Sequence, residues 1–224
     1  DAFDDCYSED KLKGYLISRN LLVEPEKIEI KTVKLPKVIN FRYIPIPSVL
    51  KLVLSKDEVR DNLENTENIM PNPELLCDYK DGTVFKSHDF FSQHPKALRL
   101  HIYADEFEVC NPIGAKRGKH KVFAVYYTIG NLHAKYRSQL KFIHLAILIR
   151  YPDMVCLQAD DHSCKELYIP LINDLKALST QGITVSLHGK EETYLAALAT
   201  FSGDNLSAHG IAGFQTFFNC HRIC

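Results

Sequence analysis

The chain has 224 residues, of which 46% are hydrophobic and 25% are charged, close to the average of globular domains. This composition excludes wholesale disorder and collagen-like order, and the length suits one domain, or one domain with a small partner. Lys and Arg number 27 against 28 Asp and Glu, so the formal charge is −1. That balance argues against a histone-like protein that binds nucleic acid through its overall charge, but it is compatible with a local basic patch.

Three further features bound the class of protein. The apolar runs are shorter than the roughly 20 residues that a membrane span needs, so we expect no membrane partner. Seven cysteines, an odd number in mostly apolar contexts, favour free thiols in a reducing compartment over a disulfide scaffold. The chain starts at Asp1, with neither an initiating Met nor a leader, and ends at Cys224, and we interpret it as a fragment of a longer protein.

The first part of the chain is rich in charged residues and has few hydrophobic ones. Residues 27–33 alternate as a half-buried strand does, and residues 48–63 carry apolar side chains at helical spacing after Ser48, a suitable N-cap. Pro71 and Pro73 flank an Asn and mark a linker. We therefore expect a small, mainly helical accessory module over residues 1–70 and a larger domain over residues 75–224.

The larger domain has the pattern of a mixed α/β fold. Strands are expected over residues 97–104, 121–129 and 183–187, and a long apolar stretch over 193–201 leads to Asp204. Helices are expected at residues 140–147 and 167–178, where apolar residues recur at helical spacing, and Gly182 ends the second helix. In the first strand, Tyr103 and Asp105 share the face opposite Leu100. The pair Tyr126 and Tyr127 is expected in the core.

Two carboxylates, Asp105 and Asp204, stand out because each lies at or near the end of a patterned strand. Carboxylates from two strand ends are a common way to hold divalent metals, which prefer oxygen ligands. The alternative is structural, because Gly-Asp-Asn also forms turns and an Asp at a strand-to-helix junction often caps the helix. Spacing alone leaves both interpretations open.

Two other clusters are candidates for binding. Cys220, His221 and Cys224 place three soft ligands within five residues, which is half of a zinc site, and the alternative is ordinary thiols. A basic loop between two expected strands could grip DNA phosphates, or it could be a solvated hairpin loop. The basic side chains of this loop are Lys116, Arg117, Lys119, His120 and Lys121.

Several strings resemble one family. Residues 78–92 read Asp-Tyr-Lys-Asp-Gly-Thr-Val-Phe-Lys-Ser-His-Asp-Phe-Phe-Ser, and residues 103–114 read Tyr-Ala-Asp-Glu-Phe-Glu-Val-Cys-Asn-Pro-Ile-Gly. Together with Gly203-Asp204-Asn205, they resemble the DDE-type transposase core of the transposon-derived proteins found in animal genomes. The resemblance covers residues 41–224.

The resemblance implies an α/β, RNase H-like mixed sheet flanked by helices. It implies that Asp105 and Asp204 are the first two of three catalytic acids and hold Mg²⁺ or Mn²⁺, with DNA at transposon ends as the substrate. The third acid would follow a Cys-rich insertion that begins near Cys220, so the core is truncated before it. The family's close cysteine pair is usually Cys-x-x-Cys, whereas three residues separate Cys220 from Cys224 here, and Zn²⁺ is a second candidate cofactor. Nuclear localisation, and a homo-oligomer in the full-length protein, are implied in the same way.

The leading expectation is therefore a transposase-like domain for metal-dependent DNA phosphodiester cleavage and strand transfer. Because the third acid is missing from the sequence, we expect this chain to be inactive by itself, which leaves open whether it is an enzyme. The alternative is a catalytically dead, transposon-derived DNA- or protein-binding module. A third interpretation, an unrelated α/β domain, predicts that the two aspartates lie far apart.

Overall fold

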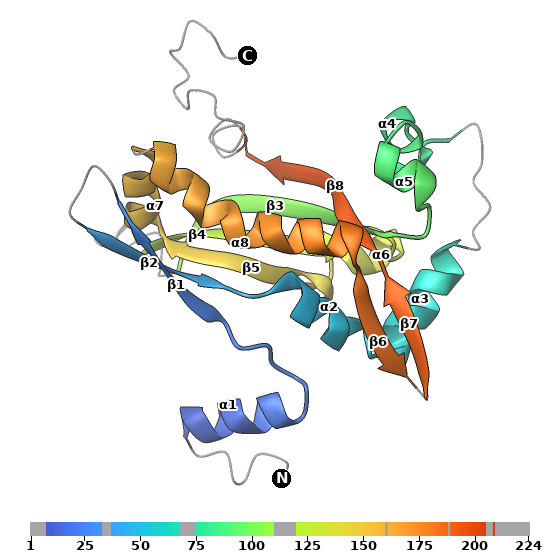
Figure 1. Cartoon of the computed structure of the whole chain (residues 1–224), viewed down its shortest axis with the longest axis horizontal. Helices are drawn as coiled ribbons and strands as arrows, with labels where there is room; N and C mark the ends of the chain where they lie inside the picture. The colour runs from blue at the N-terminus through green and yellow to red at the C-terminus, as the bar shows by residue number, and fades with distance from the viewer. Residues whose placement is uncertain are drawn as a thin grey trace, which may run out of the picture.

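The computed structural model describes residues 8–32, 37–67, 75–109, 120–159, 161–187, 189–204 and 208. Figure 1 shows a sheet crossed on one side by a long helix, with smaller helices at its margins. In chain order the elements are α1 (Glu9–Ser18), β1 (Glu26–Lys31), β2 (Val38–Tyr43), α2 (Ile46–Leu54), α3 (Asp57–Glu67), η1 (Tyr79–Asp81), α4 (Thr83–Lys86), α5 (Asp89–Gln93), β3 (Leu98–Glu108), β4 (Lys121–Ile129), α6 (Ala134–Arg137), η2 (Leu140–Phe142), β5 (His144–Arg150), α7 (Tyr151–Gln158), α8 (Asp161–Thr180), β6 (Ile183–Leu187), β7 (Lys190–Tyr194) and β8 (Ala196–Gly203).

The fold is mixed α/β, with a six-stranded, mostly antiparallel sheet flanked by helices. Its strand order is β1-β2-β5-β4-β3-β8, and the neighbours pair antiparallel except for β3 and β8, which are parallel. Antiparallel neighbours can follow one another through short turns, whereas a parallel pair needs a crossover. The chain between β5 and β8 supplies this crossover through α7 and α8. The hairpin of β6 and β7 forms a separate two-stranded sheet.

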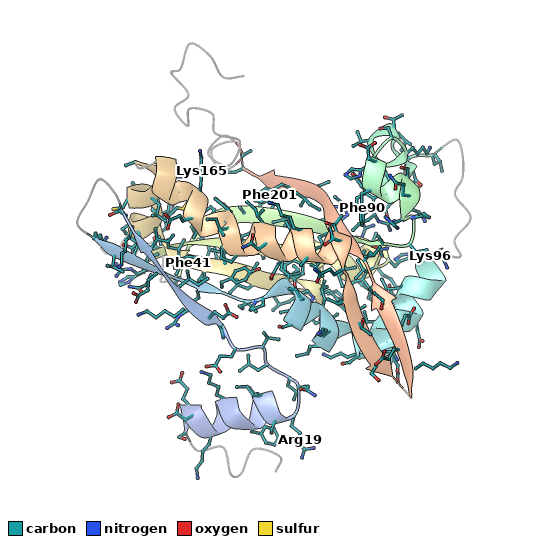
Figure 2. All side chains as sticks on the ribbon, in the orientation of Figure 1. Arg19, Phe41, Phe90, Lys96, Lys165 and Phe201 are labelled. Atoms are coloured by element: carbon teal, nitrogen blue, oxygen red, sulfur yellow. The ribbon has the colours of Figure 1, made fainter. Side chains whose placement is uncertain are left out.

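The first part of the chain shares the main sheet. Strands β1 and β2 pair with each other, and β2 pairs with β5 through Arg42 and Tyr43. Phe41, labelled in Figure 2, is 2% exposed and belongs to the same hydrophobic cluster as β3 and α8. The boundary that we expected between residues 70 and 75 therefore does not separate two hydrophobic cores. Strand pairing joins the two segments, and no local composition signal reports such pairing.

The two faces of β3 have different covers. Leu98, Leu100 and Ile102 are at most 2% exposed and pack in the main cluster with Leu167 and Leu171 of α8. Apolar residues alternate with others along the first part of β3, so these residues all lie on this face, where they pack in one cluster with residues of α8. The opposite face meets the segment from η1 to α5, where a second cluster forms around Phe91.

The second cluster covers only the beginning of that opposite face. Phe91 is 1% exposed, and Tyr79, Phe85 and Phe90 pack around it; Figure 2 labels Phe90 on the small helices. The ring of Phe85 lies under the Arg99 guanidinium, 5.5 Å from centroid to Cζ, and Tyr79 meets the His101 ring edge to face. On this face Arg99 is thus 5% exposed and His101 is half-buried.

Several sequence predictions are confirmed and two helices are corrected. Strands are present at β1, β3, β4 and β6, and α8 ends just before Gly182, whose φ is +71°. The helix expected around residues 140–147 is wrong, because residues 144–150 form β5, a strand hydrogen-bonded on both sides. A short apolar run fits a buried strand and a buried helix equally well, and pairing with β2 and β4 decides the outcome.

The helix expected from Ser48 to Leu63 is two helices. The first begins at Ile46 with Pro47 in its opening turn, a position where the missing N–H of proline costs nothing, and its N-cap is Pro45 rather than Ser48. It ends at Leu54, and α3 begins at Asp57. Pro170 lies inside α8. Among the described residues, no helix has the length and apolar character needed to cross a membrane.

Candidate metal site at the ends of β3 and β8

The strand register brings Asp105 and Asp204 to neighbouring positions. On the parallel strands β3 and β8, Ala104 pairs with Gly203, and each aspartate is the next residue along its strand. A one-residue shift between Leu100 and His101 sets this alignment. Since adjacent strands lie about 4.8 Å apart, we expect the backbones of the two aspartates to be on the order of 5 Å apart. The interpretation that predicted distant aspartates is disfavoured by this register.

Asp105 projects to the face that carries Tyr103, because side chains two residues apart on a strand share a face. Asp204 follows Gly203, the last residue of β8, and its charge adds to the effect of burial in raising the pKa of Tyr103 on this face and the pKa of Tyr151 on the side of α7. Burial, and then the negative charges of Asp105 and Asp204, raise the pKa of Tyr103 above its ordinary value. Both charges therefore act on one phenol, which remains a neutral hydroxyl and a hydrogen-bond donor at neutral pH.

The local geometry leaves the site open to solvent. Asp105 is half-buried and Asp204 is exposed. The backbone N–H of Glu106 donates to Oδ1 of Asp105 over 2.8 Å, which fixes the orientation of that carboxylate. The site thus combines a fixed carboxylate on the strand with a second one just past the end of β8.

The part of the basic loop that is described lies on the other face. Lys121 forms an ion pair with Glu106 and its ammonium lies 4.6 Å from the centroid of the Tyr151 ring. Because Glu106 alternates with Asp105 along β3, this pair belongs to the side of α7. The backbone N–H of His120 donates to Glu108 over 2.9 Å. Lys121 therefore has its charge compensated, away from the two aspartates.

The remaining predicted ligands lie outside the described residues: Lys116, Arg117, Lys119, Cys220, His221 and Cys224. Within the described part of the chain, no group of three or more His, Cys, Asp or Glu side chains has the arrangement of a metal site. Among the described residues, Cys77, Cys156 and Cys164 do not form disulfides.

Aromatic residues beside the aspartates were not singled out from the sequence. Tyr126, expected in the core with Tyr127, is only half-buried and pairs across strands with Tyr103, at 5.3 Å between ring centroids. Tyr127 is 1% exposed, so the core expectation holds for one tyrosine of the pair and is wrong for the other. Phe107 is 47% exposed and lies on the same face as Asp105. The two-residue alternation of residues 97–104, when it is extended along the chain, places Phe107 on the face of Asp105 and could have identified this residue from the sequence.

The other polar residues of this face are structural. Asp78 accepts two hydrogen bonds from the Arg137 guanidinium, at 2.8 and 3.1 Å, and the backbone N–H of Arg99 donates to the Asn131 side chain over 2.7 Å. The His101 ring lies 2.7 Å from the Thr200 hydroxyl. Burial, and then the charge of Arg137, lower the pKa of His101. These contacts attach the second cluster to the sheet.

No known protein-family model matches the chain, and no curated protein matches it in sequence.

Proposed function

We propose that this chain forms an RNase H-like core of a DDE-type transposase, which binds divalent metal at Asp105 and Asp204 for cleavage and strand transfer at DNA phosphodiesters. The observation that supports the proposal is the register of β3 and β8, which pairs Ala104 with Gly203, the residues directly before Asp105 and Asp204. The sequence strings that resemble the family contain both aspartates.

Topology supports the RNase H-like assignment. Strands β3, β4 and β5 form an antiparallel meander, α7 and α8 cross over, and β8 then lies parallel to β3 on its free side. A fourth strand beside the first, entered after a helical crossover, is the arrangement that the resemblance implies. Strands β1 and β2 extend this sheet beyond β5.

The donor set fits a hard cation. Mg²⁺ and Mn²⁺ take oxygen ligands, commonly from one or two carboxylates plus water and substrate phosphate. Asp105 and Asp204 would hold the ion, which when bound activates an attacking oxygen and stabilises the leaving one. The Glu106 N–H orients Asp105, and the protonated Tyr103 hydroxyl is available to donate to a phosphate oxygen.

Terbium luminescence tests the metal site directly. Tb³⁺ is a hard cation that takes the same oxygen ligands, and the chain has 11 Tyr and no Trp, so excitation at the tyrosine band reports a lanthanide close to tyrosine. We expect the 224-residue chain to sensitise Tb³⁺ strongly and Mg²⁺ to compete. Asp105→Asn and Asp204→Asn should abolish the signal, whereas Asp57→Asn, on α3, should leave it unchanged. Sensitised emission that survives both site variants would contradict the proposal.

A second function, a catalytically dead module that binds DNA or protein, is favoured by one observation. The described residues bring together two acids and no group of three suited to metal. This alternative predicts no Tb³⁺ signal that depends on Asp105, together with binding of DNA that is indifferent to divalent metal. In a version of the protein that carries the third acid, the leading proposal predicts that Asp105→Asn abolishes cleavage and leaves DNA binding intact.

A further inference from the structure

The face that carries the aspartates is organised in rows across the strands. One row contains Tyr126 of β4, Tyr103 of β3 and Ser202 of β8, which are paired positions on adjacent strands. Asp105 lies in the next row on β3, and Asp204 comes directly after Gly203, the last residue of β8. Phe107 follows two residues beyond Asp105 on the same face. The carboxylate pair thus has an aromatic pair on one side along β3 and a single aromatic ring on the other.

These three rings, which we call the aromatic rim (Tyr103, Tyr126 and Phe107), are accessible. Tyr103 and Tyr126 are half-buried, and Ser202 beside them is exposed, while Ile102 and Ala104 on the other face of β3 are at most 1% exposed. Phe107 is 47% exposed. The rim therefore exposes part of its aromatic surface to solvent next to two acids, and its three rings belong to neither hydrophobic cluster.

Tyr103 and Phe107 of the aromatic rim lie on either side of Asp105 along β3. A strand rises about 3.3 Å per residue, so Tyr103 and Phe107 are separated by about 13 Å, with Asp105 midway. Two aromatic positions on either side of a metal-binding pair can take two bases whose connecting phosphate lies between them. Bases inside a duplex are already stacked on both faces, so they offer no free face to such a rim.

We propose that the aromatic rim stacks unpaired nucleobases on both sides of the phosphate held at Asp105 and Asp204, so that the site takes single-stranded or locally unpaired DNA. This inference rests on the proposed function, since the phosphate position comes from the metal site. Acidic side chains repel phosphates, so stacking on neutral rings supplies attraction that the charges of this face do not. Every base has a π-face, and the rim therefore holds DNA without selecting its sequence.

An abasic oligonucleotide separates stacking from charge. The probes are oligo(dT), an abasic oligonucleotide of the same length and the corresponding duplex, each titrated into the 224-residue chain in Ca²⁺, which fills oxygen-ligand sites. Removal of one base–aromatic stack weakens binding by about 5- to 150-fold, so oligo(dT) should bind tighter than the abasic strand by at least the lower figure. The duplex should bind more weakly than oligo(dT).

Variants assign the preference to the rim. Tyr126→Leu and Phe107→Leu should each reduce the preference for oligo(dT) over the abasic strand by about 5-fold or more, whereas Tyr126→Phe and Phe107→Tyr should retain it. Tyr15→Leu, on α1, is the matched control for loss of a tyrosine elsewhere. Quenching of 2-aminopurine fluorescence in a labelled strand provides a reading on the unmodified protein, independent of any effect of the variants on folding.

The outcomes separate this inference from the proposed function. Equal affinity for oligo(dT) and the abasic strand, or no 2-aminopurine quenching, overturns the stacking inference even if Tb³⁺ binding still depends on Asp105. A preference for oligo(dT) that is lost in Tyr126→Leu supports the rim, even if Asp105→Asn leaves Tb³⁺ emission unchanged. In that last case the metal assignment fails and the stacking surface stands.

Discussion

The two halves of one face of β3 look alike in sequence and differ in the structure. The first half carries Arg99, whose guanidinium lies over the Phe85 ring, and His101, whose ring contacts the Tyr79 ring and the Thr200 hydroxyl. The second half carries Tyr103, Asp105 and Phe107, which reach solvent. Polar and aromatic residues at alternating strand positions are therefore structural where a second layer covers them, and are available for chemistry where that layer stops.

The largest effect on stability is expected at Phe91, in the second hydrophobic cluster, which packs on the first half of this face of β3. Phe91 is 1% exposed at the centre of the second cluster, so Phe91→Ala should lower the free energy of unfolding by about 3–5 kcal/mol, through lost burial and a cavity. Val84→Ala, in the same segment at 65% exposure, is the control and should change it by less than about 0.5 kcal/mol. Urea denaturation measures both. Similar small effects for both variants would show that the cover is not part of the cooperative fold.

A smaller loss is expected where β3 meets the turn after β4. A Cβ added at Gly130 would lie 2.2 Å from Nε2 of His101 and 3.2 Å from Cβ of Arg99. The His101 ring is held by Thr200 and Tyr79 and cannot simply swing away, so Gly130→Ala should cost about 1–3 kcal/mol through overpacking.

The matched control is Gly14→Ala on α1, where nothing lies within 4 Å of the added Cβ and a helical Ala stabilises by about 0.5–1 kcal/mol. Thermal or urea unfolding compares the two. If Gly130→Ala were neutral, the close approach of the turn to His101 would not be a constraint on this half of the face.

Acid should lower the free energy of unfolding, because two half-buried histidines, His144 and His101, have lowered pKa values. Burial, and then the charge of Lys56, lower the pKa of His144 to about 4, and the pKa of His101 is lowered in the same direction. The folded protein then binds fewer protons than the unfolded chain below the ordinary histidine pKa of about 6.5, so stability falls as pH falls. For His144 the expected loss between about pH 7 and pH 5 is about 1–2 kcal/mol.

Urea denaturation at a series of pH values measures this loss. His144→Phe keeps a ring beside Tyr127, with which His144 now packs at 5.4 Å between centroids, and it should flatten the pH dependence. A profile that is unchanged in this variant would show that His144 is not the group that titrates.

The smallest stability effects are expected in the open half. Asp105→Asn and Tyr126→Leu alter side chains that reach solvent, so each should change the free energy of unfolding by less than about 0.5 kcal/mol while ligand binding is lost. Denaturation of these variants beside the Phe91 variant tests the contrast between the halves directly. A loss of several kcal/mol from Asp105→Asn would place this residue among the structural ones.

Local patterns were enough for part of this fold. Alternation in residues 97–104 and the β-branched run 121–129 predicted β3 and β4, and the glycine at 182 marked the end of α8. The run that became β5 was misassigned because its apolar residues fit either period, and only pairing with β2 and β4 distinguishes them. The same kind of long-range pairing joined β1 and β2 to the main sheet.

The candidate site, like the fold, could be predicted only in part from local sequence patterns. Asp105 and Asp204 could be singled out as acids that follow patterned strands, although β3 continues through Asp105 to Glu108. The alignment of the two residues depends on a one-residue shift in the pairing of β3 with β8, which sequence patterns do not report. Tyr126 was assigned to the core because a β-branched, aromatic strand indicates an interior position. Its half-exposure follows from the cover stopping short of Tyr103, a property of the second layer and not of the strand.

The most direct test of the central claim is a crystal structure of the chain soaked in Mn²⁺, with the ion located from its anomalous scattering. We predict one or two Mn²⁺ peaks bound by oxygens of both Asp105 and Asp204, with the carboxylates within about 6–7 Å of each other. Carboxylates more than about 10 Å apart, or Mn²⁺ bound elsewhere with none between these residues, would contradict the metal site and the function proposed from it.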